Sequence, residues 1–449
     1  MSVRFECADA ALRRHWDEAE RRALGNLRDF GGKRVLVEGG GYEKIWLETQ
    51  PMGGEMYAAH DLEAARNNCQ LFMLHQRADG RMPGSIQCGE GQVEPQFNKL
   101  QGFCFPHPAL NMYHLLGRDA LWLEQLEDCL RRFDEYLWRT REKDGCLCSF
   151  CVYDTGEDNA VRYGDAPGWW EAETPPEGYA VVPMMSMDVT SYSYACRDTL
   201  ATISRLKGDG QEAKWREKAD EVARRLRLHL WDERRGACFD RDKAGRTVDV
   251  LCHNTLRCMY WGSVSQGMAD RFVKEHLLNP EEFFTPMPLP SVAVNDPAFR
   301  NNPGNDWSGQ SEGLTWQRAI RALENYGYAE LVRPLGERLF RAVIDGGYRF
   351  TQQYDPFTGA PSPGPEDYGP TILAVMAYIE HIWGVHLEMG KAWFSLGGGL
   401  KYRFERGWGG HDYLIESDGK KASATVDGRE VYSGPCGVRI ITDEQGRRA

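Results

Sequence analysis

Three carboxylates cluster in CVYDTGEDNA, residues 151–160, within a stretch rich in aromatic residues. A solvent-exposed acidic loop or a helix cap accounts for such a cluster without any chemistry. A carboxylic acid near other anions and apolar rings can instead stay protonated near neutral pH, because both surroundings raise its pKa. Trp169 and Trp170 are the nearby rings. The three carboxylates are those of Asp154, Glu157 and Asp158. A protonated carboxylic acid in this segment could donate its proton to a departing oxygen.

The elements that would position this acid are mostly helices, because apolar residues recur at a period of about 3.6 along most of the chain. Leu123, Leu126 and Leu130 lie on one apolar stripe of a helix that Asp119 caps. Further helices are predicted around 8–28, 59–77, 108–117, 188–206, 210–231, 252–278, 312–326, 328–345 and 370–384.

The predicted helices come in neighbouring pairs, and long joins between them hold most of the unusual polar and aromatic residues. These joins are 80–106, 146–186, 283–311 and 347–369. Long irregular segments in a compact domain are uncommon unless they have a function. The pattern predicts a mostly α fold, an (α/α)6 toroid of helical hairpins with the loops gathered at one end.

The sequence changes character from about residue 388. Short alternating runs such as ASATV and GVRIIT are separated by SDGK, VDGRE and TDEQG, which predicts strands joined by tight turns. We therefore expect a helical catalytic domain over 1–387 and a small β-rich domain over 388–449.

Composition excludes several classes of partner. The 449 residues contain 54 Lys and Arg and 66 Asp and Glu, for a formal charge of −12. Neither nucleic acid nor an anionic membrane surface is an expected partner, since both are bound by basic surfaces. The sequence shows no signal peptide and no long apolar run, and the 13 Cys form no disulfide framework, which favours the cytoplasm. No metal or cofactor motif is present, and His381 and His386 are expected to pack or cap.

Several segments resemble, in the same order, a clan of inverting glycosidases that holds the trehalases, processing α-glucosidase I and the bacterial mannosylglycerate and glucosylglycerate hydrolases (glycoside hydrolase family 63-like). YDTGEDNA is similar to the clan's W-E-[ST]-G-x-D-N/D segment. Over roughly 45–385 the further similar segments are MDVTSYSYACRDTLATISRLKGD, LWDERRGACFDRD, NDWSGQSEGLTW and QQYDPFTGAPSPGPEDYGPT. The resemblance implies an (α/α)6 barrel and glycoside hydrolysis with inversion.

The resemblance implies that Asp158 is the general acid. An inverting enzyme also needs a carboxylate base, about 6.5–9.5 Å from the acid, to hold a water between them. The clan's Glu base matches Gln352 here, and an amide cannot take a proton from water. Glu312 and Glu366 are the two replacements nearby in sequence. We favour Glu312, because it opens a helix in a segment that otherwise matches.

Substrate contacts are predicted from position in these segments. WLETQPMGGEMYAAHD resembles the clan's opening substrate-binding segment, and Glu55 is closest to the position of its Asp. Asp188 heads a helix, so we expect an N-cap first and hydroxyl binding second. The full set of predicted sugar contacts is Glu48, Gln50, Glu55, Tyr153, Asn159, Trp169, Trp170, Asp188, Trp307, Gln310, Trp316, Gln352 and Tyr354.

The expected function is that of an inverting, exo-acting glycosidase on a short α-linked oligosaccharide or glycoside, without a cofactor. The mismatch at Gln352 keeps two alternatives open: a sugar epimerase or isomerase on the same barrel, and a carbohydrate-binding protein that no longer hydrolyses.

Overall fold

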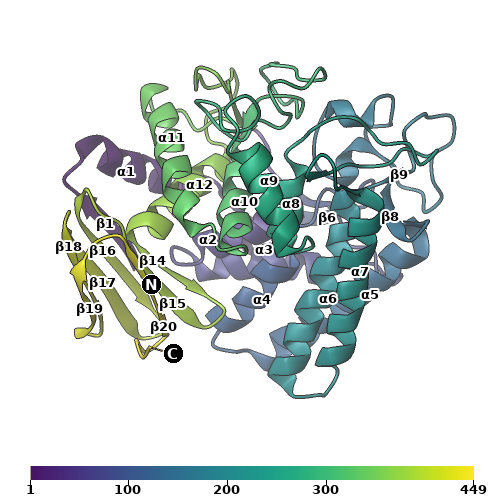
Figure 1. Cartoon of the computed structure of the whole chain (residues 1–449). Coiled ribbons are helices and arrows are strands. Elements are labelled where there is room, and N and C mark those ends of the chain that lie inside the picture. Colours follow the sequence, from purple (N-terminus) through teal and green to yellow (C-terminus); the bar gives the residue numbers. More distant parts are fainter. Residues whose placement is uncertain (1, 449) are drawn as a thin grey trace.

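A helical body and a C-terminal β region make up the chain (Figure 1). The structure is a computed structural model that describes residues 2–448. Its twelve α-helices within these residues are α1 (Ala10–Gly25), α2 (Gln50–Tyr57), α3 (Leu62–Leu74), α4 (Pro106–Leu115), α5 (Ala120–Arg141), α6 (Met187–Lys207), α7 (Glu212–Leu230), α8 (Asn254–Trp261), α9 (Gln266–Phe272), α10 (Gly313–Glu324), α11 (Val332–Asp345) and α12 (Gly369–Trp383). The mostly helical prediction is confirmed.

Helix ends follow local capping chemistry. The Asp119 carboxylate accepts from the amide of Leu121 at 3.0 Å, and so begins α5 as predicted. Helix α6 is capped instead by Ser186, whose hydroxyl accepts from the Val189 amide, so the predicted N-cap role of Asp188 is wrong. Asp188 lies within the first turn, where its side chain is free to make other contacts.

Neighbouring helices pack in pairs: α2 on α3, α5 on α6, α6 on α7, and α11 on α12. The first helix, α1, packs on the last, α12. Every residue of α12 except His381 is buried, which is typical of a helix surrounded by others. No helix in residues 2–448 combines the length and apolar character that crossing a membrane requires.

The C-terminal β region contains two antiparallel sheets. One has the order β1-β16-β17-β18-β19 and the other β14-β15-β20. The predicted runs ASATV and GVRIIT fall in β18 and β20. Strand β1 pairs with β16 from the other end of the sequence, whereas the expected division at residue 387 places it with the helices. The strands are β1 (Ser2–Cys7), β14 (Val385–Glu388), β15 (Lys391–Leu396), β16 (Lys401–Trp408), β17 (His411–Asp418), β18 (Lys421–Val426), β19 (Arg429–Pro435) and β20 (Val438–Asp443).

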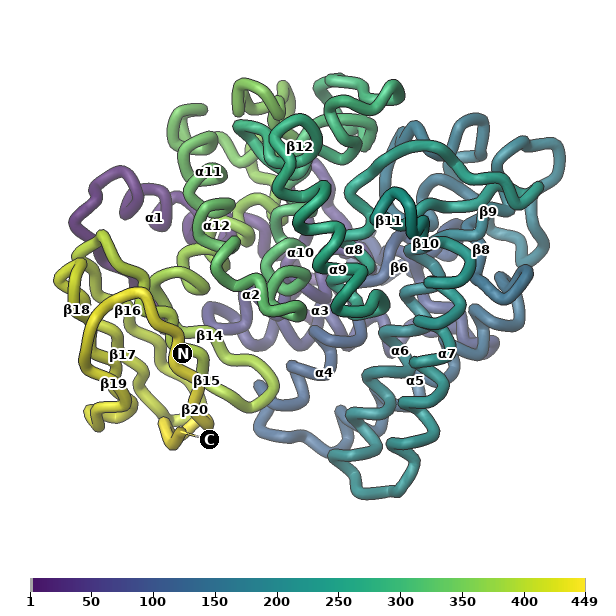
Figure 2. The backbone as a smooth tube through the Cα atoms, viewed as in Figure 1, coloured from purple at the N-terminus to yellow at the C-terminus, as the bar shows by residue number. Residues whose placement is uncertain are grey.

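Short strands tie the long joins together. In particular, β12 (Ser311–Glu312) pairs with β13 (Gln353–Tyr354), so that Glu312 lies opposite Gln353. Figure 2 shows β12 at the loop end of α10, with β14 beyond the helix's other end. The short strands are β2 (Leu27–Asp29), β3 (Arg34–Leu36), β4 (Ile45–Trp46), β5 (Ser85–Gly89), β6 (Gln92–Gln96), β7 (Glu142–Lys143), β8 (Cys146–Ser149), β9 (Met184–Met185), β10 (Trp231–Asp232), β11 (Ala237–Cys238), β12 (Ser311–Glu312) and β13 (Gln353–Tyr354).

Candidate active site

The first two carboxylates of the segment 151–160 are turned inward. Asp154 is fully buried and pairs with Arg141 at 2.7 Å. It also accepts from the backbone amides of Leu100 at 2.9 Å and Phe150 at 2.7 Å. These three bonds join the loop to its surroundings.

Glu157 belongs to a buried network of charges. It contacts Arg162, lies 2.9 Å from Arg257 and hydrogen-bonds with His253 at 3.2 Å. Burial raises the pKa of Glu157, but the two guanidiniums outweigh burial and hold that pKa well below its usual value. Asp188 is part of the same network, 2.9 Å from each of the two arginines. Its carboxylate is therefore committed to ion pairs rather than to a sugar hydroxyl.

Asp158 differs from its two neighbours, because it is partly exposed and has no arginine or lysine in ion-pair distance within residues 2–448. The Asn305 side-chain amide donates to its Oδ2 at 2.5 Å. Burial raises the pKa of Asp158, while the Asn305 bond and the charge of Lys99 oppose this increase. The expectation that Asp154 and Glu157 raise this pKa is wrong, since arginines neutralise both of them.

Asn305 joins Asp158 to Gln352, the residue at the position of the clan's base. The Gln352 amide donates to Asn305 Oδ1 at 3.0 Å, and the Tyr42 hydroxyl donates to Gln352 Oε1 at 3.2 Å. Asn305 also donates to the Tyr42 hydroxyl at 3.2 Å. Two amides and a phenol therefore connect Asp158, the predicted acid, to Gln352.

Glu312 is fully buried, directly before the first residue of α10. The Gln353 amide across the β12–β13 pair donates to its Oε1 at 2.6 Å, and Oε2 has no hydrogen-bond partner within residues 2–448. Burial raises the pKa of Glu312 well above its usual value, and the charges of Asp158 and Asp306 add to the increase.

Glu366, the other predicted base, lies at the surface. Its side chain is 44% exposed and pairs with Arg349 at 2.8 Å. A solvated carboxylate in an ion pair lacks the environment that distinguishes Asp158 and Glu312.

Glu48 lies beneath the turn that carries Asp158. It pairs with Arg318 at 2.9 Å and accepts from Gln101 at 3.0 Å. Burial raises the pKa of Glu48 to about 7. Gly156 has a φ of +71°, and a Cβ there would collide with the Glu48 carboxylate, so the turn requires glycine.

Two further predicted contacts, Trp307 and Asn159, adjoin Asp158. The Trp307 amide donates to the Asp158 carbonyl at 3.0 Å. Asn159 donates to the Asn305 carbonyl at 2.9 Å, which joins the loops 151–160 and 299–309. Tyr153 lies against the exposed Trp169, with ring centroids 6.3 Å apart. The neighbouring Trp170 is half-buried and donates to the Thr174 carbonyl at 2.8 Å.

The remaining predicted contacts have other partners. Gln50 accepts from the Trp46 amide at 2.7 Å, and Gln310 donates to Asn301 at 2.9 Å. Trp316 and Tyr354 are fully buried, so the prediction of Trp316 as a sugar platform is wrong: its ring packs edge-on against Tyr378 in the core. Glu55 lies elsewhere, paired with Arg321 at 3.0 Å.

Sequence reasoning missed Tyr42, Asn305, Gln353 and Lys99. Burial lowers the pKa of Lys99 to about 8, and its ammonium lies 5.0 Å from the Trp46 ring. The signal for Asn305 was weak, since NNPGND is also typical of a turn. Gln353 stands beside the mismatched Gln352, and only the β12–β13 register shows that it faces Glu312.

Residues 55–371, more than half of the chain, match the sequence model of the mannosylglycerate hydrolase MGH1-like glycoside hydrolase domain. The chain belongs to this family. It is a glycoside hydrolase, and the family predicted from its motifs is confirmed.

Solved structures share the fold of this glycoside hydrolase. The GH63 mannosylglycerate hydrolase from Thermus thermophilus, in complex with glucose, matches with a TM-score of 0.65 and 18% identity over 81% of this chain and 99% of that chain. Neutral trehalase Nth1 from Saccharomyces cerevisiae matches with a TM-score of 0.60 and 14% identity over 78% of this chain and 74% of that chain. A protein described as a sialidase matches with a TM-score of 0.73 and 14% identity over 98% of this chain and 41% of that chain. The last match covers the C-terminal β region as well.

Proposed function

We propose that this protein is an inverting, exo-acting glycosidase in which Asp158 is the general acid and Glu312 the general base. Asp158 stands at the position of the clan's acid. The observation that carries the proposal is its environment: a partly buried carboxyl without a cationic ion-pair partner in residues 2–448, held by the Asn305 amide. Such a carboxyl keeps a proton to higher pH than an exposed aspartic acid and can donate it to the glycosidic oxygen.

Glu312 replaces the base that Gln352 cannot provide. Its Oε2 lacks a hydrogen-bond partner in residues 2–448 and can accept from a water. Hydrolysis requires Asp158 protonated and Glu312 ionised. Because burial raises the pKa of Glu312, activity should fall with decreasing pH at a higher pH than an ordinary glutamate would cause.

The substrate we propose is a short α-linked oligosaccharide or glycoside. Membership of the family and the glucose complex of the structural neighbour support a small sugar. Two finer features accompany the proposal. The helices form an (α/α)6 toroid, supported by their pairwise packing and by the contact of α1 with α12. The protein acts in the cytoplasm, supported by 13 cysteines that are all free.

Proton NMR of a panel of α-linked glycosides tests this function. We expect release of the aglycone, and the first sugar signal to appear should be that of the anomer with inverted configuration. Retained configuration would overturn inversion. A product of unchanged mass and altered stereochemistry would indicate an isomerase, and binding without turnover would indicate a carbohydrate-binding protein.

A further inference from the structure

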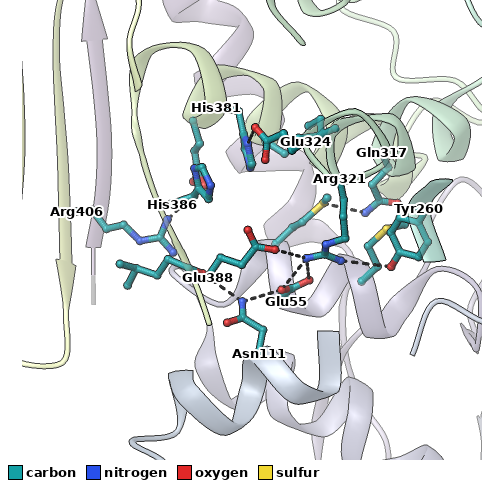
Figure 3. A pocket seen from close by; sticks show the side chains of 16 residues that line it. Glu55, Asn111, Tyr260, Gln317, Arg321, Glu324, His381, His386, Glu388 and Arg406 are labelled. Atoms are coloured by element: carbon teal, nitrogen blue, oxygen red, sulfur yellow. Dashed lines mark hydrogen bonds and ion pairs between the residues drawn. The ribbon is translucent and has the colours of Figure 1, made fainter. Parts of the chain in front are cut away.

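A second cluster of titratable side chains lies at the far end of α10 from Glu312. Glu324 is the last residue of this helix, about 18 Å from Glu312 at about 1.5 Å per residue. It lines a cavity of about 60 Å³ together with side chains from α2, α12 and β14 (Figure 3). The cavity is therefore distinct from the Asp158 site, and it has room for an ion with a few waters.

The cavity lining has more negative than positive charge. Four carboxylates and two guanidiniums give a formal charge of −2, and Arg439, which lies 2.6 Å from Glu324 Oε1, reduces it to −1. Arg321 is shared between two of these carboxylates, 3.0 Å from Glu55 and 3.5 Å from Glu388, so the guanidiniums compensate the carboxylates incompletely. A bound cation would complete the compensation. The charged lining residues are Glu55, Glu324, Glu380, Glu388, Arg321 and Arg406.

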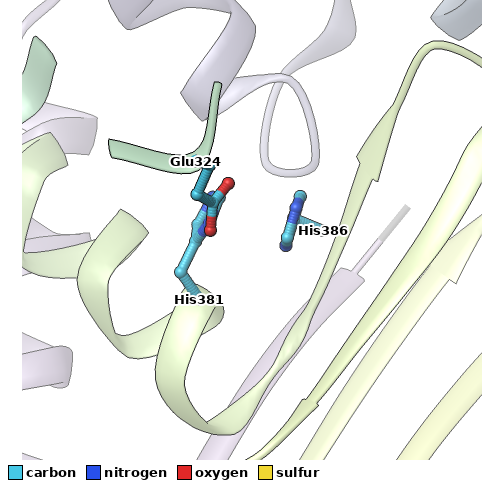
Figure 4. Close-up of side chains that lie close together, drawn as sticks. All are labelled: Glu324, His381 and His386. Atoms are coloured by element: carbon cyan, nitrogen blue, oxygen red, sulfur yellow. The ribbon is translucent and has the colours of Figure 1, made fainter. Parts of the chain in front are cut away.

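Three potential metal ligands meet in this lining. Glu324 from α10, His381 near the end of α12 and His386 from β14 place one ligand atom each within 4.8 Å of one another (Figure 4). His381 Nδ1 lies 2.9 Å from Glu324 Oε1. His386 is only 7% exposed, and neither of its ring nitrogens has a hydrogen-bond partner within residues 2–448. A buried imidazole without partners is costly, so His386 itself points to a missing ligand.

We propose that Glu324, His381 and His386 bind a divalent transition-metal ion of the zinc type. Zinc is commonly bound by imidazole nitrogen and carboxylate oxygen. In tetrahedral coordination, three protein ligands leave the fourth position for a water from the cavity. Both ring nitrogens of the buried His386 lack a hydrogen-bond partner within residues 2–448, so a ring nitrogen is available to bind the ion.

Ion binding includes one side-chain movement. The two imidazoles stack, with ring centroids 3.7 Å apart and planes inclined by 16°. The in-plane lone pairs of stacked rings run nearly parallel and do not converge on one ion. His386 is the ring that turns, because no hydrogen bond from residues 2–448 holds it. The ion would then link α10 and α12 to β14, and so join the helical body to the β region.

Metal titration of the full chain tests the site. The protein is stripped with a chelator and titrated with Zn²⁺ alone by calorimetry, and bound metal is counted after dialysis. We expect one ion per chain, a melting temperature that rises with Zn²⁺, and affinity at least tenfold weaker in His386→Ala and Glu324→Gln. The control His411→Ala removes an exposed imidazole paired with Asp427 at 2.7 Å and should bind like the wild type.

Two results would overturn the proposal. One is wild-type affinity no tighter than that of a His381→Ala/His386→Ala double variant. The other is a Co²⁺ complex with thiolate charge-transfer bands, which would place the ion on one of the 13 free cysteines. Should the variants fail to fold, anomalous diffraction from a zinc-soaked wild-type crystal decides: a peak between the three side chains supports the site, and a peak elsewhere or none contradicts it.

Discussion

Two groups of carboxylates adjoin one another in this glycoside hydrolase, and they differ in what compensates them. Glu157 and Asp188 are each held by Arg162 and Arg257, whereas Asp158 and Glu312 receive hydrogen bonds from side-chain amides. A guanidinium fixes the carboxylate in its ionised form. A side-chain amide donates a hydrogen bond to one carboxyl oxygen and allows the group to be protonated or deprotonated. The arginine-paired group therefore stabilises the fold, and we propose that the amide-bonded group carries out the acid–base chemistry.

Replacing Glu312 in the amide-bonded group should have the largest effect. We expect Glu312→Gln to lower kcat by about 10²–10⁴-fold, because an amide cannot activate water. Steady-state kinetics on an α-linked glycoside that the wild type hydrolyses measures this loss of kcat. The matched control is Glu366→Gln, which alters an exposed ion pair and should keep near wild-type activity. The reverse pattern would make Glu366 the base.

Breaking the arginine-paired group should instead cost stability. Glu157→Gln leaves two buried guanidiniums without one of their carboxylates, and we expect a loss of about 3–5 kcal/mol in the free energy of unfolding. Denaturant titration measures this loss. If Glu312→Gln destabilised the protein equally, the distinction between the two groups would be wrong.

The pH dependence of stability should also separate the groups. A carboxyl with a raised folded-state pKa contributes stability that is full below its unfolded pKa and is lost as pH rises through the folded one. For Glu312 the loss therefore begins above about pH 4.5. Glu312→Gln should be more stable than the wild type at neutral pH, with the advantage gone at pH 4. An advantage that is the same at both pH values would contradict the raised pKa.

Removing the Asn305 amide that donates to Asp158 should have the smallest effect on activity. The Asn305 bond lowers the pKa of Asp158, so in Asn305→Ala that pKa rises and the acid stays protonated to higher pH. We expect the alkaline limb of kcat/KM to move upward while the maximum rate changes by at most about tenfold. An alkaline limb that stays in place would show that Asp158 does not set it.

Much of the fold could be predicted because helical periodicity is a local signal. Helix α6 spans Met187–Lys207 where 188–206 was expected. The short helix α2 was missed, since QPMGGEMY has two glycines and no apolar stripe. Strand β1 was missed because its partner, β16, lies at the other end of the sequence. Local patterns do not record such distant pairings.

The candidate site could be predicted only where a motif names a residue. Asp158 and Glu312 came from motifs, but the contact of Asn305 with Asp158 spans 147 positions, and that of Tyr42 with Gln352 spans 310. Trp316 was misassigned because its place in a motif does not show that its helix turns it into the core. The His381–His386 pair lacks a metal motif, since its third partner, Glu324, comes from another helix.

The leaving-group dependence of the activity of Asp158→Asn shows whether Asp158 is the proton donor. A general acid matters when the departing oxygen needs a proton and matters little when the leaving group departs as a stable anion. We expect the activity of Asp158→Asn to fall about 10²–10⁴-fold on an ordinary α-glycoside and far less on the matching glycosyl fluoride or dinitrophenyl glycoside. Equal losses on both substrates, or full activity on the ordinary glycoside, would contradict the assignment of Asp158 as the proton donor.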